Sequence, residues 1–268
     1  MEAARQAAVC FASGVLPALL PMSALGRLMP DRTKDEHSKT GLWFRTGIFA
    51  CAAGSPAAAQ RASAMRNALT YREWEAMLCL CGVMSPMFFT GTLAGWLHSA
   101  EAGRKLLFIH WLSAALTALL WYAFSHPQKN SMDQPPIDHS QPCSLPQAVM
   151  QSAQAMLCVC GAMMVFAAAA SLAQSLLQTL FPQWTASHFR ELAVMKALME
   201  IGGGASAIIE TFEKPHALLS ALCGFGGLSI WLQNLLFLDK SIRPVKLLAM
   251  RAIHGAVSYA FALIFMPS

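Results

Sequence analysis

The sequence predicts an all-α, polytopic helical membrane protein made of two repeats that contain broken or re-entrant helices. Of its 268 residues, 56% are hydrophobic and only 12% are charged, whereas soluble domains carry about 25% charged residues. The mean hydropathy is +0.45, and no stretch alternates apolar and polar side chains as a half-buried strand does. A soluble protein of this composition would expose large apolar patches, so we place the chain in a lipid bilayer.

Apolar stretches give the order of the expected helices. A helix needs about 20 apolar residues to cross the hydrocarbon core. The stretch at 46–60 is too short for that, and 146–180 suffices for a tilted span with an interfacial turn. Four stretches reach the length alone: 6–29, 105–125, 191–210 and 246–266. The 19 basic and 14 acidic residues lie in short segments between such stretches, which is typical of loops flanking membrane spans and excludes a nucleic-acid partner.

A proline-rich linker divides the chain nearly in half. Residues 126–147 contain five of the fourteen prolines. We therefore assign residues 1–125 to a first repeat, 126–145 to a linker and 146–268 to a second repeat.

The two halves resemble each other in the order of their segments. RKLLFIHWLSAALTALLWYAF (104–124) parallels RPVKLLAMRAIHGAVSYAFALIF (243–265). CGVMSPMFFTGTLAGW (81–96) likewise parallels CGFGGLSIWLQN (223–234). These matches indicate an internal duplication.

Each half contains a helix that small residues and proline interrupt. Thr70 and Glu73 form a capping box, and the helix that follows is expected to break at Ser85-Pro86, because Pro86 has no N–H for the carbonyl of Gly82. In the second half, a helix begins at Pro215 and breaks at Gly224–Gly227.

Interrupted helices at matching positions of two repeats indicate a solute site. Close packing through proline and glycine kinks is the alternative. We expect the two breaks to converge on one polar pocket near mid-membrane, and we expect Pro86→Ala to rebuild the helix, stabilise the protein and damage function. The predicted substrate-binding residues are Ser55, Ser85, Pro86, Thr90, Thr92, Glu200, Gly226, Gly227, Ser229, Gln233 and Asn234.

Ionisable residues inside apolar stretches are further candidates, because charge is costly in lipid. Glu200 precedes a glycine run, and it either acts in function or forms a neutralising pair with Lys196. His110 and His254 are either satisfied core residues or proton-relay groups. Arg251 is expected to snorkel toward a membrane interface.

The sequence carries no motif of a catalytic triad, a zinc protease, a phosphate-binding loop or a dinucleotide fold. We therefore predict no enzyme activity, no catalytic residue, no metal and no cofactor.

Several segments together resemble one family. GVLPALLPMSALGRLM (14–29), AAGSPAAAQ (52–60), LTYREWEAM (69–77), SPMFFTGTLAG (85–95) and GFGGLSIWLQ (224–233) resemble sporulation integral membrane proteins of the YlbJ type, which carry the nucleoside-recognition or Gate domain. The chain departs from the family pattern of Asn-Pro at Ser85-Pro86 and of Gly-Tyr-Pro at Gly54-Ser55-Pro56. The resemblance implies a role in endospore formation.

The relative direction of the repeats has two readings. Counting lysine and arginine per loop, with every stretch taken as a full span, favours parallel repeats. The Gate resemblance implies inverted repeats, which we favour because the 46–60 stretch is too short to be a reliable span.

Two functions follow from these observations. The first is a transporter or pore for a small polar solute, nucleoside-like or other, in the cell membrane or the membrane around a forespore. The second is a non-transporting scaffold that recruits partners in spore envelope assembly. Short loops favour the first, because a scaffold presents its functional residues on loops. The bilayer is the expected partner, and the oligomeric state is left open.

Overall fold

The computed structural model describes residues 2–28, 39–125, 144–238 and 242–266, and these residues form helices without any strand. Large apolar side chains such as Leu119, Leu157 and Ile264 lie exposed on the outside of the long helices, where lipid chains accept them. The predicted all-α, polytopic membrane fold is confirmed. Five helical segments in the described residues are long and apolar enough to cross a membrane: Glu2–Leu28, Ala100–Phe124, Leu145–Leu180, His216–Phe237 and Pro244–Phe265.

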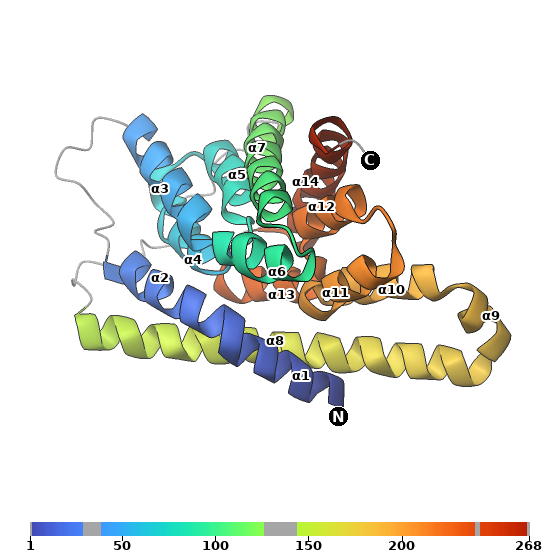
Figure 1. The fold of residues 1–268 in the computed structure, drawn as a ribbon. Helices are drawn as coiled ribbons and strands as arrows, with labels where there is room; N and C mark the ends of the chain where they lie inside the picture. The colour runs from blue at the N-terminus through green and yellow to red at the C-terminus, as the bar shows by residue number, and fades with distance from the viewer. Residues whose placement is uncertain (1, 29–38, 126–143, 239–241, 267–268) are drawn as a thin grey trace.

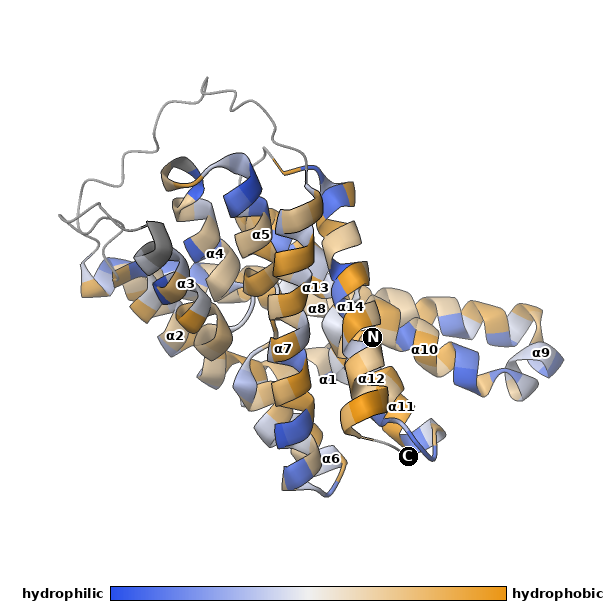
Figure 2. Cartoon of the chain, turned by 90° about the horizontal axis from the view of Figure 1, so that it is seen from above, coloured by the Kyte–Doolittle hydropathy of each residue, from blue (hydrophilic) through white to orange (hydrophobic). Residues whose placement is uncertain are grey.

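A pair of long helical segments lies along one side of the molecule. Its first segment comprises α1 (Glu2–Cys10) and α2 (Leu16–Leu28), joined by a π-helical stretch, Phe11–Val15. Its second is α8 (Leu145–Leu180), a single helix of 36 residues where a span with a separate turn was expected. In Figures 1 and 2, α8 runs across α7 (Ala100–Phe124).

The remaining helices complete the two halves of the chain. In the first half they are α3 (Lys39–Ala53), α4 (Ala57–Ala64), α5 (Tyr71–Cys81) and α6 (Ala94–Trp96), the last preceded by a π-helical stretch, Phe88–Leu93. In the second half they are α9 (Pro182–Ser187), α10 (Phe189–Met199), α11 (Ile201–Thr211), α12 (His216–Phe225), α13 (Gly227–Phe237) and α14 (Pro244–Phe265).

The predicted linker, 126–145, lies outside the described residues except for its last two. Ser144 caps α8, and its hydroxyl and backbone N–H form a capping box with Gln147. The division into two repeats stays a prediction.

The stretch at 191–210 is not the single span that its length indicated. Glu200 has an extended backbone that separates α10 from α11, and the two helices pack against each other. A Cβ on Gly204 would collide with the backbone of Ala197, so a side chain at 204 is incompatible with this close contact. The segment is therefore a helical hairpin.

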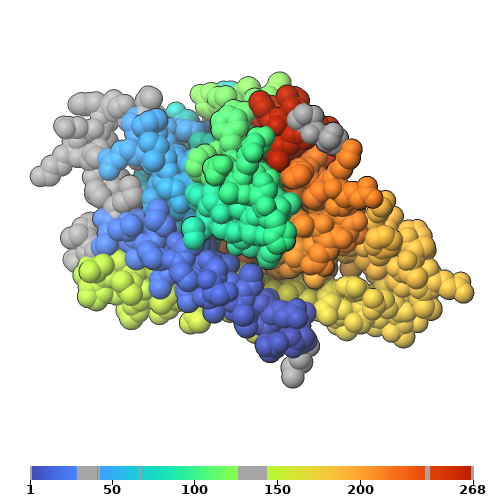
Figure 3. Space-filling view, viewed as in Figure 1, coloured from blue at the N-terminus to red at the C-terminus, as the bar shows by residue number. Residues whose placement is uncertain are grey.

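The central helices α7 and α14 run in opposite directions. The ring of Phe108, near the start of α7, lies 6.2 Å from the ring of Phe265, at the end of α14. At the other end of the pair, Lys246 of α14 contacts Glu75 of α5. Figure 3 shows α6 and α7 beside α12 and α14 in the middle of the molecule. This antiparallel course is the one that inverted repeats require.

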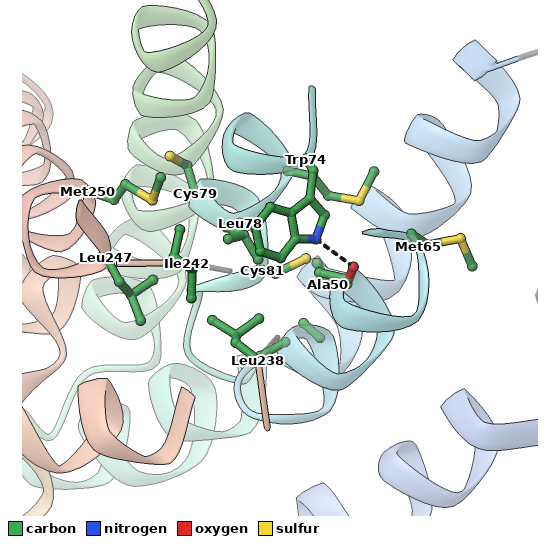
Figure 4. Packing of buried hydrophobic residues seen from close by; sticks show 14 of the residues in the cluster. Ala50, Met65, Trp74, Leu78, Cys79, Cys81, Leu238, Ile242, Leu247 and Met250 are labelled. Atoms are coloured by element: carbon green, nitrogen blue, oxygen red, sulfur yellow. Dashed lines mark hydrogen bonds between the residues drawn. The ribbon is translucent and has the colours of Figure 1, made fainter. Parts of the chain in front are cut away.

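Two large buried apolar clusters each combine residues from both halves of the chain. Trp74 anchors the first cluster, where its Nε1–H donates to the carbonyl of Ala62 at 2.9 Å and its ring packs near Met65 and Leu78 (Figure 4). The second cluster includes Phe89, Leu106 and Leu219. The polar site described next connects helices that contribute to both clusters.

Candidate functional site

The first helix break begins earlier than the sequence indicated. The capping box of Thr70 and Glu73 starts α5 as expected, but the helix ends at Cys81, and Gly82 to Ser85 are not helical. Pro86 begins the next helical piece, a position where its missing N–H is harmless. The interruption therefore covers Gly82 to Ser85, directly before Pro86, and not the Ser85-Pro86 step alone.

The second break lies where it was predicted. Helix α12 ends at Phe225, and Gly226 and Gly227 adopt φ angles of 81° and 73°. L-amino acids with a side chain rarely adopt this left-handed region. The two glycines therefore let α13 start in a new direction directly after α12.

One arginine joins the two breaks. The Arg251 guanidinium donates through Nη1 to the carbonyl of Gly82 and through Nε to the carbonyl of Phe225 at 2.9 Å. Arg251 is only 2% exposed, so the expectation that it snorkels to an interface is wrong. Carbonyls at the ends of broken helices need donors in an apolar interior, and Arg251 supplies them to α5 and α12 together.

Helix dipoles favour a cation at this place. The C-terminus of a helix carries a partial negative charge of about half an electron. Helix α5 approaches Arg251 from one end of the molecule and α12 from the other, and both end beside it. The two helix ends thus offset part of the arginine charge. We use the name junction for Arg251, the two helix breaks and the buried histidines His110 and His254.

A pair of buried histidines lies beside Arg251. The backbone N–H of Met84, inside the first break, donates to Nε2 of His110 at 3.0 Å. The rings of His110 and His254 are 4.7 Å apart, and Nε2 of His254 lies 3.1 Å from the carbonyl of His110. Both residues are 1% exposed. His110 thus supports the first break, and His254 ties α14 to α7.

Hydroxyl groups extend this polar network along α7 and α14. Ser113 Oγ lies 2.6 Å from Ser258 Oγ and 3.0 Å from Nε2 of His254. Ser220 of α12 donates to the carbonyl of Ser258 at 3.2 Å. A buried hydrogen-bonded network of this kind holds helices in a defined register.

Each half contains a second interruption, between α3 and α4 in the first half and between α10 and α11 in the second. Each of these packs against the helix break of its own half. Between α3 and α4, the N–H of Ser55 donates to the carbonyl of Val83 at 2.7 Å, and Gly54 lies against the backbone of Ser85. In the second half, Gly227 lies against the carbonyl of Ala197 at the α10–α11 turn. Each half therefore brings its own two interruptions together.

Several predicted polar residues lie inside the protein next to these breaks. Ser55 Oγ–H donates to Oδ1 of Asn234, which connects the first half to α13. Gln233, Asn234 and Ser229 are all buried. Among the described residues, Ser229 Oγ has no hydrogen-bond partner.

Glu200 has a role that neither reading of the sequence included. Its carboxylate accepts from the N–H groups of Gly202 and Gly203, both at 2.7 Å. These are orphan donors at the start of α11, so Glu200 caps the helix. Glu200 is 5% exposed, and its carboxylate is held within the hairpin of α10 and α11.

Three other predicted residues lie in grooves or on the surface of the protein. Pro86 lines an apolar groove of about 890 Å³ together with Phe44, Ile48 and Trp111. Thr90 is exposed, and its hydroxyl donates to the carbonyl of Pro86 at 3.0 Å. Thr92 lines a separate pocket of about 410 Å³ formed with α1.

An ion pair that the sequence did not predict connects the two halves of the chain. Glu75 is 2% exposed, its Oε1 lies 2.7 Å from Nζ of Lys246, and its Oε2 accepts from Nε1 of Trp121 at 3.2 Å. Glu75 directly follows Trp74 and precedes the apolar second half of α5, and this was the available signal, because a carboxylate inside the protein needs a partner.

Comparisons with protein-family models, with curated proteins and with solved structures found no match to this chain.

Proposed function

We propose that this protein carries a small polar solute across a membrane, past the two helix breaks that meet at Arg251. The observation that supports this most is the position of the arginine, which binds the ends of α5 and α12 at once. Transporters place solute sites at discontinuous helices of this kind, because the unsatisfied backbone groups there can bind a solute.

Packing kinks alone do not account for the residues at the junction. A kinked helix needs small residues, whereas this site also contains a buried cation and two buried imidazoles. Ionisable groups are expensive inside a membrane and are usually kept for function. The composition of the junction therefore favours a solute path over a purely structural contact.

The arrangement also offers a means of alternating access. Helices α5 and α12 approach the junction from opposite ends of the molecule and are held by one side chain. Release of one helix end by Arg251 changes the contacts of the other. Such a coupled pair can open toward one side of the membrane at a time.

On the resemblance to YlbJ-type proteins, we place this transport in endospore formation, in the cell membrane or the membrane around the forespore. A complementation experiment tests this part. In a spore-forming host that lacks its own YlbJ-type gene, the chain should restore spore yield, and a fluorescent fusion should label one of these membranes. Normal localisation without restored yield contradicts the sporulation role.

Uptake by proteoliposomes tests the transport function. Vesicles with and without the purified protein are compared across a panel of neutral, anionic and cationic metabolites. We expect at least one polar solute to accumulate, and Arg251→Lys to lower that uptake at least tenfold. Arg104→Lys, an exposed site on α7, serves as the control and should keep wild-type uptake. Uptake equal to that of empty vesicles for every solute contradicts the proposal and favours the scaffold function.

A further inference from the structure

Three nitrogen atoms at the junction have no hydrogen-bond partner within the described part of the chain. They are Nη2 of Arg251, Nδ1 of His110 and Nδ1 of His254. Each belongs to a side chain that is at most 2% exposed, so water at the protein surface does not serve it. A buried polar atom without a partner is unfavourable, and here three belong to one cluster.

The hydrogen bonds that are formed define what each free imidazole nitrogen offers. Nε2 of His110 accepts from the N–H of Met84, so the proton of the neutral ring is on Nδ1, which is a donor. Nε2 of His254 faces the carbonyl of His110. Because a carbonyl only accepts, Nε2 of His254 carries the proton and its Nδ1 is an acceptor.

Among the residues that the structure describes, no carboxylate pairs with Arg251. Its two hydrogen bonds go to backbone carbonyls. The carboxylates that are buried in the described residues are engaged elsewhere, Glu75 with Lys246 and Trp121 and Glu200 with the start of α11. Its free Nη2 therefore lacks the anionic oxygen that guanidinium groups bind best.

We infer that the junction binds an oxyanion that carries a neighbouring hydroxyl or amino group. This inference rests on the proposed function and names the class of its solute. Oxygens of a carboxylate or phosphate accept from Nη2 of Arg251 and from Nδ1–H of His110, and an O–H or N–H of the same solute donates to Nδ1 of His254.

Other solute classes fit these three atoms less well. A cation is repelled by Arg251, since the helix ends offset only part of its charge. A neutral solute leaves the guanidinium without an anionic partner, and an anion without a donor leaves Nδ1 of His254 unsatisfied. The combination of two donors, one acceptor and a positive charge therefore selects a hydroxylated or aminated anion.

A binding experiment with matched small molecules tests the inference. Thermal unfolding of the purified full chain in nanodiscs is followed with lactate, propionate, lactamide or choline at equal ionic strength. Propionate lacks the hydroxyl of lactate, and lactamide lacks its charge. We expect lactate to raise the unfolding temperature most, propionate to raise it less, and lactamide and choline to leave it unchanged.

Two glutamine variants locate the binding to the junction without removing its structural hydrogen bonds. In His254→Gln the amide N–H replaces the Nε2–H donor, and in His110→Gln the amide oxygen replaces the Nε2 acceptor. We expect His254→Gln to abolish the difference between lactate and propionate. We expect His110→Gln to weaken both at least tenfold in apparent Kd. His98→Asn, at an exposed turn, is the control and should bind as wild type does.

Three results overturn the inference. They are no stabilisation of the wild type by lactate or propionate, stronger stabilisation by lactamide or choline, and unchanged lactate binding in both glutamine variants. These results are distinguishable from failure of the transport function. Uptake of a neutral or cationic solute refutes the solute class alone, whereas oxyanion binding without uptake of any solute refutes transport alone.

Discussion

Arg251 of α14 donates a hydrogen bond to the carbonyl of Gly82, a residue 169 positions earlier in the chain. The same guanidinium binds the carbonyl of Phe225, so a single side chain connects the ends of two helices from the two halves. Gly82 and Gly226 lie so close to the guanidinium that a Cβ at either position would collide with it. The position of Arg251 therefore depends on glycine at both breaks.

Loss of Arg251 should destabilise the protein strongly. Arg251→Met leaves the carbonyls of Gly82 and Phe225 without donors, and each buried unsatisfied group costs about 1–3 kcal/mol. We expect the free energy of unfolding to fall by about 2–5 kcal/mol, as measured by denaturant titration in detergent micelles. Arg104→Met, on the exposed face of α7, should change it by less than about 0.5 kcal/mol. Equal effects of the two substitutions would show that Arg251 does not hold the breaks.

The ion pair of Glu75 and Lys246 should matter more than an exposed pair of the same geometry. Both it and the pair of Glu101 and Lys105 have N–O distances of 2.7 Å, but the Glu75 side chain is 3% exposed and the Glu101 side chain 69%. We expect Glu75→Gln to cost about 1–3 kcal/mol and Glu101→Gln at most about 0.5 kcal/mol. A double-mutant cycle with Lys246→Gln should give a coupling energy above about 0.5 kcal/mol. A coupling near zero would contradict a stabilising contact between the halves.

Glycine at the second break should be irreplaceable, unlike glycine in an open helix. Gly226 has a φ of 81° and faces Arg251, so Gly226→Ala is strained and displaces the guanidinium. We expect a loss of more than about 1 kcal/mol in unfolding free energy. Gly161 lies within α8 with open space around it, and Gly161→Ala should stabilise by about 0.5–1 kcal/mol. Stability curves for both variants in the same detergent provide the comparison, and the expected changes have opposite signs.

Replacement of Pro86 should not rebuild a continuous helix, contrary to the expectation from the sequence. The interruption begins at Gly82, and Pro86 is already the first residue of the next helical piece. Because proline is well tolerated at that position, we expect Pro86→Ala to change the free energy of unfolding by less than about 1 kcal/mol and to leave the helix content by circular dichroism unchanged. An increase in helix content together with higher stability would show that Pro86 imposes the break.

Local features of this protein follow from the sequence alone. Apolar length and low charge predict the membrane fold, the capping box predicts the start of α5, and Gly226 and Gly227 predict the second break. These features depend on backbone conformation and on solvation of neighbouring residues, which nearby sequence contains. The first break shows the limit of such reasoning, because a proline can follow the end of one helix or begin the next. In this protein Pro86 begins the next helical piece.

Only the tertiary structure decides which residues complete the broken helices. The sequence shows that the carbonyl of Gly82 needs a donor, but it predicts that Arg251 snorkels to an interface. It leaves His110 as a core residue or a proton-relay group, and Glu200 as a functional residue or the partner of Lys196. Their partners lie far away in the chain or in backbone N–H groups that a break exposes. A contact between positions 169 residues apart arises from the packing of α7 against α14 and from the need to satisfy every buried polar group. The donors and acceptors that meet this need come from several helices, so no single segment of the sequence identifies them.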